Sequence, residues 1–201
     1  MKVFIFICAV AALLGGCTST TPTRERSVAY VIYDIKAGPE VGSGKIAEAV
    51  KVALQANTSQ VQVVNSIPPS PLPAAAPRFQ LVSPFKGSSM EALAAASGQS
   101  LQVPMCEGAV LSANAADTSM SKYGEATTFF VCLMPYQGGW SLNIYTTFSK
   151  ASGAFSAATL GATLARPLVG DTSQFIPRTV NAIVTGVKGT GATVTLVEAY
   201  P

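Results

Sequence analysis

The feature that most constrains this chain is an apolar run from Val3 to Leu14, which follows a single positive charge at Lys2. The run is shorter than the roughly 20 residues that a membrane-spanning helix needs. A basic start, a short apolar run and small residues after it are typical of a secretory signal peptide. The sequence therefore predicts that the rest of the chain folds outside the cytoplasm and that residues 1–16 take no part in the fold.

The residues that end this run, Leu14-Gly15-Gly16-Cys17, resemble the lipobox of bacterial lipoproteins, in which an aliphatic and two small residues precede a cysteine. The resemblance implies that the Cys17 thiol receives a diacylglycerol, that a peptidase cuts before Cys17 and that the new amino group is acylated as well. Two or more acyl chains hold a protein stably on a bilayer. The residue after Cys17 is Thr18 rather than Asp, and in this position the chain resembles lipoproteins that are sorted to the outer membrane. The alternative is an ordinary signal peptide with a chance cysteine.

Three segments follow from this interpretation: a signal peptide at 1–16, a lipidated N-terminus and polar tether at 17–26, and one periplasmic domain at 27–201. No internal repeat or shift in composition divides the last segment, and its length suits a single domain. The expected location is the bacterial cell envelope, at the periplasmic face of the outer membrane.

The chain holds four cysteines, of which Cys8 is lost with the signal peptide and Cys17 is the lipid attachment site. Cys106 and Cys132 remain. Two cysteines in an exported domain predict one structural disulfide, which would stabilise the fold by roughly 3–4 kcal/mol. Two separate buried thiols are the first alternative. A reactive thiol is the second, although the chain has no histidine to activate it.

Apolar patterning predicts the elements of the first half of the domain. Val28–Ile35 is almost entirely apolar and predicts a central strand covered on both faces. Apolar residues recur at four-residue spacing over 46–54, which predicts a helix ending near Asn57 with Ser43 as its cap. The remaining elements expected here are strands at 61–66 and 79–82, a helix at 90–97 and a stiff proline-rich segment at 67–77.

The strongest local pattern lies at 127–148, where a β-prone run and an alternating run flank Gln137-Gly138-Gly139. This pattern predicts a hairpin with one buried side. The buried side would hold Trp140, Leu142, Ile144 and Phe148, and the polar side Ser141, Asn143, Tyr145 and Thr147. A disulfide from Cys132 would tie this hairpin to a strand that contains Cys106.

The rest of the chain completes the predicted fold. The other expected elements are a strand at 105–113, a loop at 114–125, helices at 154–165 and 175–187, and a last strand at 193–197. Together the elements predict an α+β fold, a two-layer sandwich in which helices pack mainly on one face of an antiparallel or mixed sheet.

Composition argues against several classes of function. Charged residues make up 11% of the chain, against roughly 25% in a typical soluble domain, and the net charge is +3. So few charges and so small a net charge do not suit a nucleic-acid-binding protein. Without histidine, the commonest metal ligand and general base, neither a metal nor another cofactor is expected.

Two catalytic motifs are only partly matched. Gly38–Ile46 lies where a phosphate-binding loop belongs, but Pro39 and Ile46 occupy two of its defining positions, so no nucleotide is expected. Ser119-Met120-Ser121-Lys122 matches the Ser-x-x-Lys of penicillin-binding enzymes, but that family's downstream motifs are missing from the sequence. An enzyme is therefore not expected.

Aromatic residues gather around the hairpin, and Tyr136, Trp140 and Tyr145 form the candidate binding surface. Hairpin aromatics also serve as core and as cross-strand pairs, which is the alternative for these three. A lipid-held chain poor in charge predicts a non-catalytic structural or assembly lipoprotein that binds the bilayer through Cys17 and another envelope protein. The second hypothesis is a lipoprotein that binds a glycan or an apolar small molecule at the hairpin 127–148. The proline-rich segment is either a surface loop or a docking segment.

Overall fold

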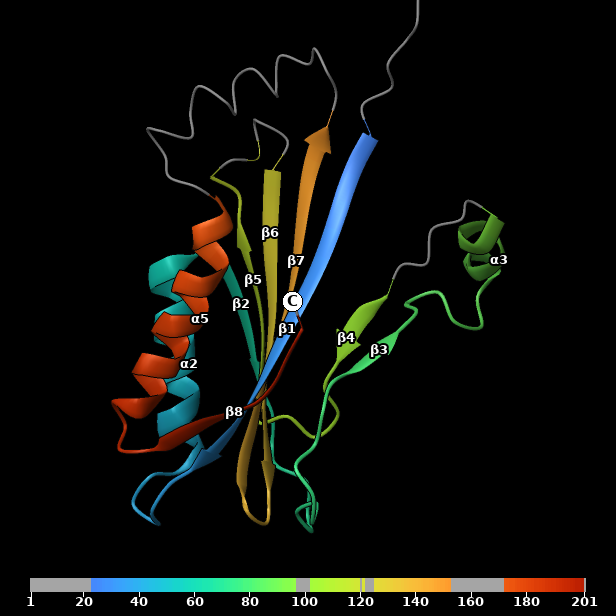
Figure 1. Cartoon of the computed structure of the whole chain (residues 1–201). Helices are drawn as coiled ribbons and strands as arrows, with labels where there is room; N and C mark the ends of the chain where they lie inside the picture. The colour runs from blue at the N-terminus through green and yellow to red at the C-terminus, as the bar shows by residue number, and fades with distance from the viewer. Residues whose placement is uncertain (1–22, 97–101, 120, 122–124, 153–171, 201) are drawn as a thin grey trace, which may run out of the picture.

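The computed structural model describes residues 23–96, 102–119, 121, 125–152 and 172–200. Its main feature is a six-stranded sheet in the order β2-β5-β6-β7-β1-β8, and every neighbouring pair in it is antiparallel. Figure 1 shows helices α2 and α5 side by side over one face of this sheet. The predicted α+β fold, with helices on one face of an antiparallel sheet, is confirmed.

The strands of the large sheet are β1 (Thr23–Lys36), β2 (Gln60–Asn65), β5 (Leu111–Asp117), β6 (Glu125–Tyr136), β7 (Gly139–Ser152) and β8 (Thr193–Tyr200). A two-stranded sheet pairs β3 (Gln80–Val82) with β4 (Val103–Met105). The helices are α2 (Ser43–Asn57), α3 (Ser89–Ala96) and α5 (Thr172–Lys188). Figure 1 shows β3, β4 and α3 on the side of the sheet opposite to α2 and α5.

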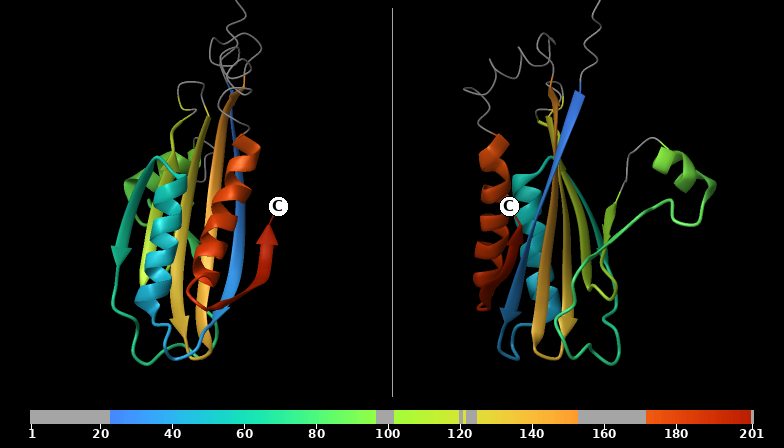
Figure 2. Two further views of the ribbon diagram at one scale, coloured as in Figure 1. Left: turned by 90° about the vertical axis from the view of Figure 1, so that its left-hand side faces the viewer. Right: turned by 45° about the vertical axis from the view of Figure 1, so that its right-hand side comes forward.

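The two ends of the sheet differ. At the N-terminal end, Thr23 of β1 pairs with Ser152 of β7. At the turn end, β1 finishes at Lys36 and the β6–β7 hairpin turns at Gln137 and Gly138. Helix α2 also begins at the turn end, as the two views of Figure 2 show.

The main core lies between the sheet and the helices. Helix α2 buries the apolar stripe that its spacing predicts, namely Ile46, Val50 and Leu54. Helix α5 buries Ile183 and Val187 against the same cluster. The two helices approach closely at Gly186, where a Cβ would lie 3.3 Å from the carbonyl oxygen of Ala49. A small residue there therefore permits the close helix packing that closes the core.

The opposite face of the sheet is also covered, which the alternating pattern did not predict. Ser141 and Asn143 of β7 lie on this face, yet they are only 2% and 1% exposed. They are covered because residues 66–79, the crossing segment that leads from β2 to β3, pass over the sheet here. The backbone N–H of Phe79 donates to the Asn143 side chain at 3.2 Å. The expectation of a hairpin with only one buried side is therefore wrong.

The single strand expected at 105–113 is also wrong. The chain turns after Met105, with Gly108 at a φ of +72°, so that β4 and β5 belong to different sheets. This left-handed conformation favours glycine. Strand β5 then continues to Asp117, into the region expected to be a loop.

Further expectations need correction or fall outside the structure. Strand β1 is longer than 28–35 and begins at Thr23, so residues 23–26 belong to the sheet rather than to the tether expected at 17–26. Val28 is 41% exposed rather than covered. Ser43 does not cap α2, whose N-cap is Gly42 without a side-chain hydrogen bond. The helix expected at 154–165 lies outside the described residues.

An aromatic row crosses the face opposite to the helices. Cross-strand pairing aligns Phe130, Tyr145, Tyr30 and Tyr200 on the neighbouring strands β6, β7, β1 and β8. The ring of Phe79 packs edge-on against Tyr30 and Tyr145, with centroids 5.4 and 5.5 Å away. Cross-strand aromatic pairs of this kind stabilise a sheet, and here they also hold the crossing segment in place.

Candidate binding site

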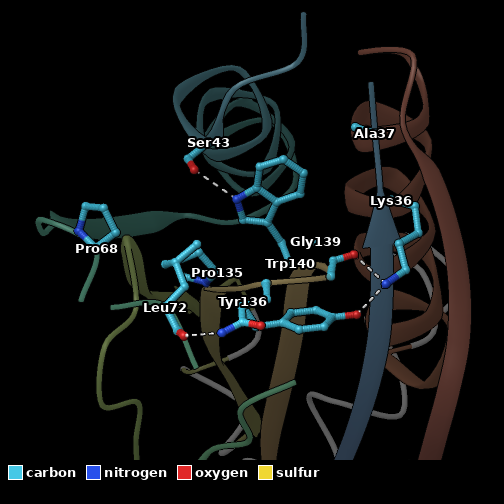
Figure 3. Close-up of a pocket in the computed structure, with 11 residues that line it drawn as sticks. Lys36, Ala37, Ser43, Pro68, Leu72, Pro135, Tyr136, Gly139 and Trp140 are labelled. Carbon is cyan, nitrogen blue, oxygen red and sulfur yellow. Dashed lines mark hydrogen bonds between the residues drawn. The ribbon is translucent and has the colours of Figure 1, made fainter. Parts of the chain in front are cut away.

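A pocket of about 420 Å³ opens at the turn end of the sheet, where three parts of the chain meet (Figure 3). The parts are the β6–β7 turn, the join between β1 and α2, and the proline-rich segment. The lining residues are Lys36, Ala37, Ser43, Pro68, Leu72, Pro135, Tyr136, Gln137, Gly138, Gly139 and Trp140. Two of the three predicted binding residues, Tyr136 and Trp140, therefore lie in one concave site.

One side of the pocket is a polar network centred on Tyr136. Its hydroxyl donates to Asp34 Oδ1 at 2.6 Å and accepts a hydrogen bond from Lys36 Nζ at 2.6 Å. Lys36 also donates to the carbonyl oxygen of Gly138 and forms an ion pair with Asp34 at 3.3 Å. The hydrogen bond with Tyr136, helped by Asp34, raises the pKa of Lys36 above its usual value. Lys36 is therefore a fixed ammonium group at the rim of the pocket.

The other side of the pocket is built on Trp140. The indole Nε1–H donates to Ser43 Oγ at 2.9 Å, which joins β7 to the first residue of α2. Ser43 was expected to cap the helix, but its hydroxyl orients the tryptophan instead. The preceding residue, Gly139, has a φ of +142°, and a Cβ there would collide with the carbonyl oxygen of Ile35. The turn thus requires glycine beside the tryptophan.

The proline-rich segment forms the third side. The backbone N–H of Gln137 donates to the carbonyl oxygen of Pro73 at 2.9 Å, and its side-chain amide donates to that of Leu72 at 3.3 Å. Leu72 and Pro68 complete the apolar part of the lining. These hydrogen bonds fix the segment against the hairpin turn, as Figure 3 shows for Leu72.

The pocket continues on the far side of Ser43 and Pro68. A second hollow of about 290 Å³ shares these two residues and runs along the first turns of α2. Its lining is more polar and includes Glu48 and Lys51, which form an ion pair at 2.9 Å, together with Asn65. The turn end therefore carries an aromatic pocket and a polar groove side by side.

Tyr145, the third predicted binding residue, is not part of this site. Its side chain is only 5% exposed and lies in the aromatic row between Phe79 and Phe130. Burial raises the pKa of its hydroxyl. The interpretation of Tyr145 as a surface residue is therefore corrected, because the crossing segment covers a side of β7 that the sequence pattern presents as polar.

The structure joins Cys106 and Cys132 by a disulfide, with their Cα atoms 6.1 Å apart. The bond connects the residue that follows β4 to the middle of β6. It therefore fixes the small sheet to the large one. Cys17, the predicted lipid attachment site, lies outside the described residues.

A second polar cluster, which the sequence did not reveal, lies at the edge of the aromatic row. Glu198 of β8 accepts a hydrogen bond from the Tyr30 hydroxyl at 2.6 Å and forms an ion pair with Arg78 at 2.7 Å. The hydrogen bond from Tyr30 and then that from Arg78 lower the pKa of Glu198. Because Arg78 precedes Phe79, this cluster pins the crossing segment to the outer strand.

Among the residues that the structure describes, no three or more His, Cys, Asp or Glu side chains gather where they could hold a metal ion. Within the same part of the chain, no helix is long and apolar enough to cross a membrane.

Comparisons with known proteins give no function. No family model matches the sequence, and no curated protein matches it. One solved structure that is similar is an uncharacterized protein from Rhizobium leguminosarum, 10% identical, with a TM-score of 0.32. The match covers 85% of this chain and 99% of that one. The likeness is too distant to carry an argument.

Proposed function

We propose that this protein is a lipid-anchored, non-catalytic component of the bacterial cell envelope, and that the turn end of its sheet binds a partner protein. The anchor rests on the lipobox resemblance of Leu14–Cys17 and the polar residues that follow it. Lipid attachment would hold Cys17 at the periplasmic face of the outer membrane. The polypeptide from Cys17 to Thr23 can span no more than about 20 Å, so β1 begins near the bilayer.

The length of β1 then separates the binding site from the membrane. Strand β1 has 14 residues, which at about 3.4 Å each place Lys36 roughly 45 Å from Thr23. The pocket residues Tyr136 and Trp140 lie beside Lys36. A site at this end of an anchored protein is presented to other envelope proteins rather than to the lipid.

The proposal is carried by a pocket whose polar lining is held by hydrogen bonds and which has exposed apolar side chains beside it. The polar side chains that line it, namely Lys36, Ser43, Tyr136, Gln137 and Trp140, are all hydrogen-bonded within the protein. Beside Pro68, the side chain of Ile67 is 91% exposed, and Leu72 is 36% exposed. A preformed hollow with apolar side chains at its rim can accept a protruding group of a partner at little entropic cost.

Crosslinking in native membranes tests the binding site directly. A photoreactive amino acid in place of Ile67 should give a stoichiometric adduct with one envelope protein. The same probe in place of Val52, which is 53% exposed on α2, is the matched control and should give none. Leu72→Glu, placed in the Ile67 probe protein, should abolish the adduct. Equal adducts from positions 67 and 52, or none at 67, would contradict the binding site.

Fractionation tests the anchor separately. The substitution Cys17→Ser should move the protein from the membrane fraction to the soluble fraction, because no acyl chain can then be attached. Cys8→Ser, which changes another cysteine of the same N-terminal region, should leave the protein in the membrane fraction. A Cys17→Ser protein that stays with the membrane would refute lipid anchoring.

The volume of the pocket favours one alternative, a glycan or an apolar small molecule as the ligand. Pockets of about 300–1,000 Å³ suit small molecules, and Trp140 and Tyr136 offer aromatic rings. The chain holds a single tryptophan, Trp140, so its fluorescence reports on this pocket alone. A saturable fluorescence change on titration with soluble cell-wall glycan fragments, lost in Leu72→Glu, would favour this alternative. No change with the fragments would leave the partner protein as the ligand.

A further inference from the structure

We propose that the arm, defined as β3, β4 and α3, lies against the bilayer that holds Cys17 and gives the protein a second point of membrane contact. The inference rests on the lipid anchor proposed above and adds an interaction surface to it. The arm is proposed to contact the lipid surface. Finding a protein bound to the arm instead would overturn the proposal.

The arm exposes several large apolar side chains. Leu93 and Met90 of α3 are 64% and 49% exposed, and Met105 and Leu81 of the small sheet are 54% and 42% exposed. Clustered exposed apolar side chains mark interaction sites. Charge on the described part of α3 is limited to Glu91, which accepts a hydrogen bond from the backbone N–H of Gly87 at 2.8 Å. Among β3, β4 and the described part of α3, Glu91 is thus the one charged side chain.

The path of the chain directs the arm toward the N-terminal end of the sheet. The crossing segment leaves the pocket at Leu72 and meets β7 at Asn143, further from the turn. Figures 1 and 2 show that α3 lies beyond β3 and β4 in the same sense, on the side where β1 begins. Val28, near that end of β1 and on the same face as Tyr30, is 41% exposed. This face therefore exposes an apolar side chain near the end that the tether reaches as well as on the arm.

The tether limits how far that end can stand from the membrane. The chain from Cys17 to Thr23 spans at most about 20 Å, so the start of β1 stays within that distance of the lipid surface. Apolar side chains that reach the boundary between headgroups and acyl chains add to the hold of a lipid anchor. The base of the arm is fixed to β6 by the Cys106–Cys132 disulfide. Contact at the arm would therefore orient the whole sheet and point the turn end away from the membrane.

Crosslinking to lipid tests the arm in the lipidated full chain, reconstituted in vesicles of phosphatidylethanolamine and phosphatidylglycerol. A photoreactive amino acid in place of Leu93 should form severalfold more phospholipid adduct than the same probe in place of Val52, on the opposite side of the sheet. Equal lipid adducts at the two positions would overturn the proposal. So would a protein adduct at 93, in native membranes, in place of the lipid adduct.

A second variant keeps the test independent of the probe position. With the probe in place of Met105, the double substitution Met90→Glu and Leu93→Glu should remove most of the lipid adduct, while Val52→Glu should leave it unchanged. Both changes are at exposed positions, so the fold should survive. An undiminished adduct in the double variant would overturn the arm contact. Failure of the anchor is distinguishable, because the protein would then not float with the vesicles at all.

Discussion

Helices α2 and α5 cover one face of the large sheet with a continuous apolar core, whereas an irregular segment covers the other face through specific bonds. Behind the helices lie fully buried residues such as Phe129, Leu133 and Ile144. On the other face, the buried side chains include Ser141 and Asn143, and the cover is held by hydrogen bonds, an ion pair, aromatic contacts and a disulfide. Apolar burial is roughly proportional to area, while each hydrogen bond contributes a smaller amount. The helix face is therefore stabilised by apolar burial, and the other face by a disulfide and by bonds that also fix the position of the covering segment.

The largest expected loss of unfolding free energy comes from a substitution on the helix face of the sheet. Phe129→Ala removes a fully buried ring that contacts Phe175 of α5 and should cost about 3–5 kcal/mol of unfolding free energy. Urea denaturation followed by circular dichroism measures the loss. Val52→Ala, at an exposed apolar position on α2, is the control and should change the free energy little. A loss for Phe129→Ala as small as the control's would break the comparison.

The disulfide should give the next largest effect, and it should act on the other face. The double variant Cys106→Ala and Cys132→Ala should lose roughly 3–4 kcal/mol, because its unfolded chain is no longer constrained. Amide hydrogen exchange should rise in β3 and β4 more than in α2. Reductant should destabilise the unmodified protein and leave the variant unchanged. If amide hydrogen exchange rose equally in α2 and in β3 and β4, the disulfide would not act mainly on the face opposite to the helices.

Asn143→Ala should have a smaller effect on the same face. The side-chain amide accepts from the Phe79 backbone and donates to Ser141 Oγ at 2.8 Å, and it is almost fully buried. Losing these bonds should cost about 1–3 kcal/mol of unfolding free energy, because the Phe79 N–H is left without its partner. Asn114→Ala, at an exposed position on β5, is the matched control for the change of residue type. Thermal unfolding that does not distinguish the two variants would contradict this role.

The smallest effect is expected from Glu198 and should depend on pH. The hydrogen bond from Tyr30 and the bond with Arg78 lower the pKa of Glu198 below its ordinary value of 4.5. Its stabilising contribution is therefore present above 4.5 and is lost as pH falls through the lowered pKa. The difference in melting temperature between the unmodified protein and Glu198→Gln should shrink on acidification. A difference that is constant with pH would show that the charge does not hold the segment.

The elements that depend on local pattern could be predicted from the sequence. The stripe of Ile46, Val50 and Leu54 identified α2, and the alternation around Gln137–Gly139 identified the β6–β7 hairpin. These signals are local because helices and hairpins bring together residues that are close in sequence. The same holds for the glycine at 139, which the turn requires.

The cover of the second face could not be predicted, because it depends on contacts between distant residues. Lys36 bonds to Tyr136 across 100 positions, and Phe79 meets Asn143 across 64. No pattern around Ser141, Asn143 or Tyr145 shows that a separate segment will bury them. Two residues of the predicted binding surface, Tyr136 and Trp140, therefore line one pocket, whereas Tyr145 does not. Nothing in the sequence indicated that Asp34, Lys36 and Ser43 would bond to them.

The position of β1 governs how the protein can be made. This strand is synthesised first among the described elements, yet its two neighbours are β7 and β8, the last strands of the sheet. Until those strands are synthesised, its apolar stretch has no partner and stays open to wrong associations, as is usual for sheets with non-local pairing. The pairing of β1 therefore waits for almost the entire polypeptide, although β2, β5 and β6 can pair earlier. A chain stalled before β7 would leave β1 without a partner and open to chaperones and proteases.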